Sequence, residues 1–122
     1  MQRVIDLKHV GPKTQVRRLI EELIDRLEDK LQHFPSDALS VHVLFEANGS
    51  QRLYRVAVTC HVPGYMVAAH EENRDPGVAI RKTFDEVERQ LLKRNAMLNR
   101  EHRRQTRRKT MAIVEPPDLE PR

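Results

Sequence analysis

Basic side chains recur in the C-terminal third of the sequence at a spacing that suits phosphate binding. The residues that fall within about 40° of one another on an ideal helix are Lys82, Arg89, Lys93 and Arg100. A row of exposed cations on one side of a helix can follow the backbone of a nucleic acid. We therefore take as candidate RNA contacts this row and its basic neighbours, namely Lys82, Arg89, Lys93, Arg94, Arg100, Arg103, Arg104 and Arg107.

The charge distribution indicates an acidic partner for this region. Residues 89–109 contain nine basic residues and one acidic residue, a net charge of +8, whereas the whole chain carries +4. The remainder is therefore mildly acidic at −4, so a basic arm extends from an acidic body. A solvated helix face is the ordinary explanation for such charges, but too few acids balance these. A membrane surface is disfavoured because residues 105–122 have few large apolar side chains and no aromatic anchor.

The aromatic residues narrow the kind of nucleic acid that the chain can read. Single-strand readers stack bases on exposed aromatic rings. The sequence has no tryptophan, and strand alternation places Phe45, Tyr54 and Tyr65 on the core side of the predicted sheet. The sequence thus favours structured RNA that is held by its backbone over readout base by base.

No arrangement of residues indicates catalysis or metal binding. Three histidines share the outer side of the predicted sheet, where two-residue turns would pair His42 with Arg55, His61 with Met66 and His70 with Ala57. No acid or cysteine joins them at ligand spacing. Cys60 points inward without a base to activate it, and phosphate-binding glycine loops are absent. We expect no enzyme activity, cofactor, metal or small-molecule substrate.

The pattern of apolar residues predicts the order βαβββα. A strand over 3–8 is followed by a helix over 14–34, whose apolar residues recur at steps of three and four. Three strands follow from Leu39, joined by turns at Asn48-Gly49 and Pro63-Gly64. Asp75 and Pro76 form the cap and first position of a second helix, which is expected to end near Arg103.

These elements predict an α+β fold, a two-layer βαβββα sandwich. Its four-stranded mixed sheet would have both helices packed on one face, with the first two strands parallel. The predicted domain covers residues 1–103, and residues 104–122 form a basic, then proline-rich, disordered tail. A single cysteine and the lack of any apolar run of membrane-spanning length indicate a cytoplasmic protein.

The segment that opens the second helix resembles the ribosome hibernation-promoting factors, also called ribosome-associated inhibitors or sigma-54 modulation proteins. The positions that match the family pattern in residues 75–93 are Asp75, Ala79, Ile80, Arg89, Gln90, Leu91 and Lys93. Val16-Arg17 and Arg26-Leu27 stand where the family has similar residues on its first helix. Together with the βαβββα order, the resemblance covers about residues 1–100.

The resemblance implies a translation silencer that binds the small ribosomal subunit near the tRNA and mRNA sites. It would contact ribosomal RNA through the second helix and idle ribosomes under stress. Arg89 and Lys93 carry over directly as RNA contacts. The chain has no room for the extra C-terminal domain of long family members, so we expect a short form that acts as a monomer on single ribosomes.

Several positions depart from the family pattern. Gly77 stands where the family usually has tyrosine, and the positions where it often has lysines hold Asn95, Met97 and Asn99. The basic residues are displaced toward Arg100–Lys109. Two alternatives therefore remain: a protein that binds structured RNA away from the ribosome, and a regulator whose basic arm docks on an acidic protein.

Overall fold

The computed structural model describes residues 1–8, 14–48 and 52–114, with side chains described as far as residue 96. The chain divides into two compact units, Met1–Gln90 and Leu91–Arg122. Among the described residues, no helix contains an apolar stretch that is long enough to cross a membrane.

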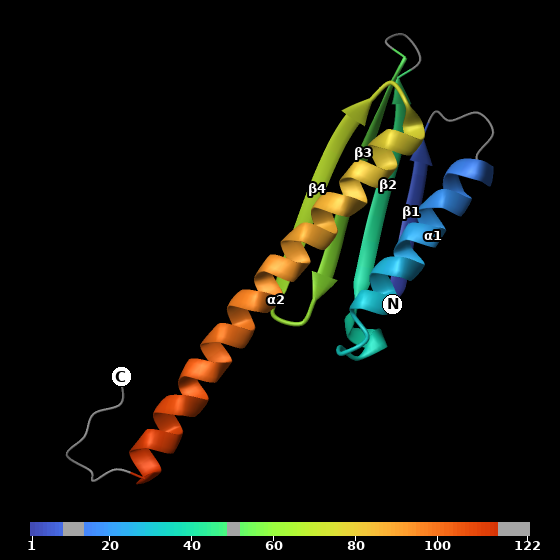
Figure 1. The fold of residues 1–122 in the computed structure, drawn as a ribbon. Coiled ribbons are helices and arrows are strands. Elements are labelled where there is room, and N and C mark those ends of the chain that lie inside the picture. The colour runs from blue at the N-terminus through green and yellow to red at the C-terminus, as the bar shows by residue number, and fades with distance from the viewer. Residues whose placement is uncertain (9–13, 49–51, 115–122) are drawn as a thin grey trace. The chain divides into compact units, whose positions relative to one another are not determined.

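Four strands and two main helices follow one another in the predicted order (Figure 1). The elements are β1 (Gln2–Lys8), α1 (Thr14–Lys30), the short 3-10 helix η1 (Ser36–Ala38), β2 (Ser40–Asn48), β3 (Leu53–Val62), β4 (Tyr65–Asn73) and α2 (Pro76–Val114). The sheet order is β1-β2-β3-β4, with β1 parallel to β2 and the other neighbours antiparallel. In Met1–Gln90, α1 and the start of α2 cover the same face of the sheet. The predicted two-layer α+β sandwich is confirmed.

Strand alternation decides which side chains form the core. In β2 the even-numbered side chains face away from the helices, while Val41, Val43 and Phe45 are at most 1 % exposed. The inward residues of β3 are buried in the same way, including Cys60. One apolar sheet face is therefore sealed by helices and the other is left open, as is common in sheets with antiparallel pairs.

The stripe of α1 packs onto that face as predicted, although the helix ends earlier than expected. Ile20, Ile24 and Leu27 have no exposed surface. The sequence predicts a helix to Phe34, but α1 ends at Lys30 and the chain continues in a tight turn, with Phe34 N–H donating to Leu31 O at 3.0 Å. Such i→i+3 bonds tighten a last helical turn, and the proline that follows Phe34 disfavours the α conformation there.

The β2–β3 pairing differs from the predicted register. Asn48 pairs with Leu53, so four residues connect the strands instead of a two-residue turn at Asn48-Gly49. Residues 49–51 lie outside the described part of the chain, and Arg52 has a positive φ of 51°. His42 consequently lies opposite Thr59 and not Arg55, as predicted. Because the shift is four residues, every side chain keeps its predicted face.

Helix α2 continues past its predicted end. It runs to Val114, so residues 104–114, which the sequence assigns to a disordered tail, are helical. The segment contains no glycine or proline before Pro116, and basic and glutamine residues favour helix. The compact units divide between Gln90 and Leu91, and the domain boundary after residue 103 stays a prediction.

Candidate nucleic-acid interface

The start of α2 is fixed by the cap that the sequence predicts. Asp75 accepts a hydrogen bond at its Oδ1 atom from Val78 N–H at 3.0 Å, and Ala79 N–H donates to Asp75 O at 3.1 Å. Asn73 Oδ1 accepts from the Asp75 N–H at 2.9 Å and so holds the cap itself. These bonds satisfy N–H groups that have no partner within the helix, and they set where the helix begins.

Burial then sets which side of Pro76–Gln90 faces solvent. Ile80, Phe84 and Val87 are at most 1 % exposed, and Thr83 is buried with its hydroxyl donating to Ala79 O at 2.7 Å. A helix buried along this stripe must turn its opposite side outward. Both predicted RNA contacts in this unit, Lys82 and Arg89, are exposed on that opposite side.

Gln90 anchors the same stretch of α2 to the edge of the sheet. Its Nε2 atom donates to Ala68 O on β4 at 3.1 Å. Strand β4 is an edge strand, so its outward carbonyl has no neighbouring strand to bond with. Because Gln90 directly follows Arg89, this bond fixes how α2 is rotated about its own axis next to Arg89.

Arg89 is held by a neighbouring acid and is not a solitary cation. Its Nε atom donates to both carboxylate oxygens of Glu86, at 3.0 and 2.8 Å, and its Nη2 atom lies 2.8 Å from Glu86 Oε2. These hydrogen bonds lower the pKa of the Glu86 carboxyl and raise that of the Arg89 guanidinium. The Arg89 side chain is still 66 % exposed. Because guanidinium has five N–H donors, donors remain for a phosphate.

A nearly buried carboxylate joins the two helices of this unit. Glu88 on α2 is 11 % exposed at its side chain and binds Lys30 Nζ at 2.7 Å, with Arg26 Nε 3.6 Å away. Sequence reasoning missed this contact. The available signal was a charged residue beside the apolar stripe of the second helix, since buried carboxylates are normally paired. Glu88 thus keeps two partly exposed cations of α1, Lys30 and Arg26, close to α2.

The remaining predicted contacts lie in the second unit. Lys93 and Arg94 are exposed. Arg100, Arg103, Arg104 and Arg107 fall within the helical span of α2, and their side chains lie outside those that the structure describes. This stretch, residues 91–114, contains eight basic residues and one acidic residue, a net charge of +7.

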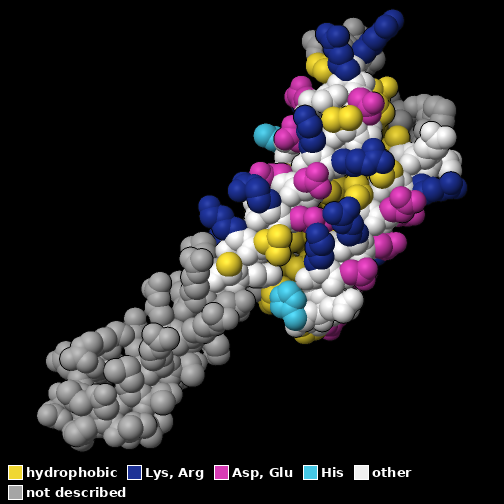
Figure 2. Space-filling model, viewed as in Figure 1, with side chains coloured by type: hydrophobic (Ala, Val, Ile, Leu, Met, Phe, Trp, Pro, Cys, Tyr) yellow, Lys and Arg dark blue, Asp and Glu magenta, His cyan; other side chains and the backbone are white. Residues whose placement is uncertain are grey.

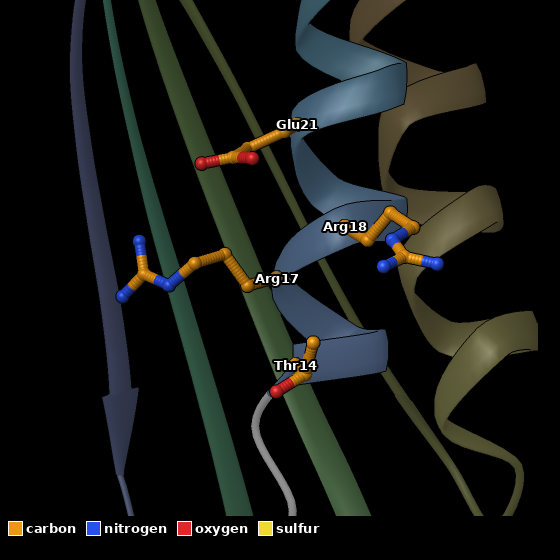
Figure 3. A pocket seen from close by; sticks show the side chains of 4 residues that line it. All are labelled: Thr14, Arg17, Arg18 and Glu21. Carbon is orange, nitrogen blue, oxygen red and sulfur yellow. The ribbon is translucent and has the colours of Figure 1, made fainter.

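The helix side of the first unit is mixed in charge. Figure 2 shows Lys and Arg side chains interspersed with Asp and Glu over this side. A shallow pocket at the start of α1 is lined by Thr14, Arg17, Arg18 and Glu21. In Figure 3, Arg17 and Glu21 extend to one side of α1 and Arg18 to the other. Because Glu21 offsets part of the charge, this pocket has only a small net positive charge.

The outer sheet face lacks the features of a base reader or a metal centre. Phe45 is fully buried and its ring lies 5.7 Å from that of Tyr54 on the core side. Contrary to expectation, an acid does join one histidine: His42 Nε2 lies 2.7 Å from Asp6 Oδ2. The parallel β1–β2 register, which no tight turn fixes, brings them together. Among the described residues, no three ligating side chains cluster.

Cys60 fits no reactive role in this structure. It is a free cysteine with no exposed surface. Burial raises the pKa of its thiol to about 11, so almost none of it is thiolate near neutral pH. The prediction of an inert core cysteine agrees with this environment.

The first unit is a small α+β sandwich, and the second unit continues α2 as a basic helix. Residues 4–99 match the family described as sigma 54 modulation protein / S30EA ribosomal protein. The chain therefore belongs to this family of ribosome-associated proteins, which is a non-enzymatic class. The predicted family resemblance and the expectation that the chain is not an enzyme are confirmed.

Similar proteins agree with this assignment. The ribosome hibernation promotion factor of Deinococcus radiodurans is 35 % identical over 86 residues, which are 70 % of this chain and 44 % of that protein. The chain thus spans less than half the length of this curated relative.

Two solved structures share the fold, each at 22 % identity. A ribosomal subunit interface protein from Coxiella burnetii has a TM-score of 0.63 and covers 79 % of this chain and 99 % of its own. The Protein Y N-terminal domain of Thermus thermophilus has a TM-score of 0.59 and covers 74 % and 94 %.

Proposed function

We propose that this chain is a translation silencer that binds small-subunit ribosomal RNA through the basic side of α2. The observation that carries the proposal is the net charge of +7 over residues 91–114, in a helix that begins in a firmly capped, packed segment. The names of the similar proteins, a hibernation promotion factor and a subunit interface protein, support a ribosomal partner.

The candidate contacts differ in what each can do. Arg89 offers a planar guanidinium whose N–H donors are only partly used by Glu86, and the remaining donors suit a bidentate phosphate contact. Lys82 and Lys93 supply point charges. Arg94, Arg100, Arg103, Arg104 and Arg107 extend the basic surface along the helix. Such contacts hold an RNA backbone in position without reading its bases.

The open sheet face supports a backbone-binding mode over base stacking. Its described outward residues include no Phe, Tyr or Trp side chain, and these large exposed rings are the usual platforms for base stacking. We propose that one copy binds per small subunit in the cytoplasm and idles the ribosome under stress, with no cofactor or small-molecule substrate.

Co-sedimentation with purified ribosomal subunits in sucrose gradients tests the proposal. The wild type should migrate with the small subunit at low salt, and its affinity should fall by roughly 0.7–0.9 log units per tenfold rise in salt for each phosphate contacted. The double variant Arg89→Glu with Lys93→Glu should lose most of this binding. A matched control, Lys8→Glu with Arg55→Glu, makes the same charge change on the sheet face.

Three outcomes separate the candidate functions. Loss of binding in the α2 variant alone supports the ribosomal function. Equal loss in both variants would show that net charge, and not α2, determines binding. If the folded wild type ignores both subunits at low salt, the function belongs to another structured RNA or to an acidic protein.

A further inference from the structure

The open face of the sheet carries an ordered pattern of charge. The strand register aligns Lys8 with Glu46, Glu46 with Arg55, and Arg55 with Glu72. These four residues point away from the helices and form one line across all four strands, with signs that alternate along it. Arg55 and Glu72 pair at 2.9 Å, whereas among the described residues Lys8 and Glu46 have no ion-pair partner. We call this line the charge ladder.

We propose that this face binds a second copy of the same chain about a two-fold axis parallel to the strands. Such an axis reverses the order of the ladder on the facing sheet, because a two-fold interface brings the same patch of both copies together. Lys8 then faces Glu72 of the second copy, and Glu46 faces Arg55 of the second copy. Every opposing pair in the ladder has opposite signs.

The neighbouring line of residues is complementary about the same axis. Asp6, Leu44, Ala57 and His70 are aligned by the strand register. Reversal places Asp6 opposite His70 of the second copy, and Leu44 opposite Ala57. In the next line, Val4, which is 44 % exposed, meets Ala68. The carboxylate of Asp6 therefore faces an imidazole of the second copy, and the apolar side chains of Leu44 and Val4 face the small side chains of alanines.

Of the two axes that run along and across the strands, only the axis along them gives that match. A two-fold axis across the strands would place the charge ladder on the line that begins at Gln2 and ends at Met66, which carries no carboxylate, lysine or arginine. Unlike charges across an interface select register and partner. The pattern therefore identifies both the occupant, a second copy, and its orientation.

The size of the face predicts a weak, reversible dimer. Four strands about 4.8 Å apart and four outward residues on each, about 6.6 Å apart, cover roughly 500 Å² per copy. A standard interface buries about 800 Å² per partner, so we expect a dissociation constant on the order of 100 µM. Helix α1 and the Pro76–Gln90 stretch of α2 lie on the other face of the sheet, so the pairing leaves Lys82 and Arg89 accessible.

Analytical ultracentrifugation of the full chain tests the proposal. The wild type should show a monomer–dimer equilibrium at low salt, because exposed charges are screened as salt rises. Lys8→Glu and Glu72→Lys should each weaken self-association by about tenfold, since each creates two like-charge contacts. Asp85→Lys, an exposed reversal on the helix side, is the matched control and should dimerise like the wild type.

The decisive sample is a mixture of the two single variants. Within one copy these positions are three strand spacings apart, roughly 14 Å, so neither change can repair the other inside a chain. Between copies the substituted side chains face each other with opposite signs. The mixture should therefore associate as strongly as the wild type, whereas each variant alone does not. A wild type that stays monomeric at about 500 µM, or a mixture no stronger than its components, overturns the proposal.

Discussion

The two stretches of α2 have the same secondary structure and very different charge. Pro76–Gln90 contains three basic and three acidic residues, a net charge of zero, whereas residues 91–114 carry +7. In the first stretch the charges are used within the fold: Glu88 binds α1 cations and Glu86 holds Arg89. The first stretch therefore stabilises the domain, and the proposed function assigns the RNA contacts mainly to the second.

This division explains why the candidate contacts are not equivalent. Arg89 lies at the end of the packed stretch, where it pairs with Glu86 and is followed by Gln90, which bonds to Ala68 O on β4. The distal cations have only one acidic residue, Glu101, among them in sequence. Changes to the buried side of the first stretch should therefore act mainly on stability, and changes to the exposed cations of α2 mainly on RNA affinity.

Removing the packed ring of Phe84 should have the largest effect. Phe84 is 1 % exposed in the core, so Phe84→Ala should lower the free energy of unfolding by about 3–5 kcal/mol. Urea denaturation measures this loss. The milder Phe84→Leu keeps the domain folded for binding assays, in which its RNA affinity should stay within about twofold of wild type. A large loss of affinity in folded Phe84→Leu would break the proposed division.

Neutralising the distal cations should lower RNA affinity and leave the stability of the first unit almost unchanged. Changing Arg100, Arg103, Arg104 and Arg107 to glutamine should lower small-subunit affinity by about a hundredfold and reduce the slope of log affinity against log salt by about 3. The free energy of unfolding of Met1–Gln90 should change by less than about 0.5 kcal/mol. A matched variant replaces four first-unit arginines with glutamine, namely Arg17, Arg18, Arg52 and Arg74. Equal losses of affinity in the two variants would contradict a specific role for the distal stretch.

Removing the cations that bind Glu88 should destabilise the domain more than neutralising Glu88 itself. Glu88→Gln leaves Lys30 and Arg26 able to return to water, since their side chains are 42 % and 59 % exposed. We expect it to cost about 1 kcal/mol, whereas Lys30→Met with Arg26→Met, which strands a nearly buried carboxylate, should cost about 3 kcal/mol. Thermal or urea unfolding of both variants tests this order. A larger cost for Glu88→Gln would show that the contact acts differently.

Releasing Arg89 should have a small effect on RNA affinity. Glu86→Gln removes the anion that competes with phosphate for the guanidinium, so affinity should rise by about twofold. Asp85→Asn is the matched control, because it removes the same charge from the exposed neighbour of Glu86 and leaves the Glu86–Arg89 pair in place. If both variants raise affinity equally, the effect comes from net charge and not from Arg89.

Sequence patterns predicted the fold where one local rule decided the outcome. Alternation placed Val43 and Phe45 in the core, and an aspartate before a proline marked the start of α2. The β2–β3 register could not be predicted in this way, because it depends on how many residues the connection after Asn48 uses. The shift left side-chain faces unchanged only because it was an even number of residues.

The candidate site was predictable in composition but not in its contacts. The basic residues of α2 are visible in the sequence, and the Glu86–Arg89 pair follows from the i,i+3 rule for helices. The Glu88–Lys30 contact joins residues 58 apart in sequence, and the Asp6–His42 pair depends on a parallel register without a tight turn. Both needed the packed structure.

Photo-crosslinking from position 93 asks whether α2 touches ribosomal RNA. A photo-reactive amino acid would replace Lys93, which is exposed in the basic stretch, and Met66, which is 52 % exposed on the open sheet face, would serve as the matched position. After irradiation of the complex with small subunits, we predict crosslinks to small-subunit ribosomal RNA from position 93 and none from position 66. Crosslinks to RNA from position 66 alone, or to protein alone from position 93, would contradict binding through the basic side of α2.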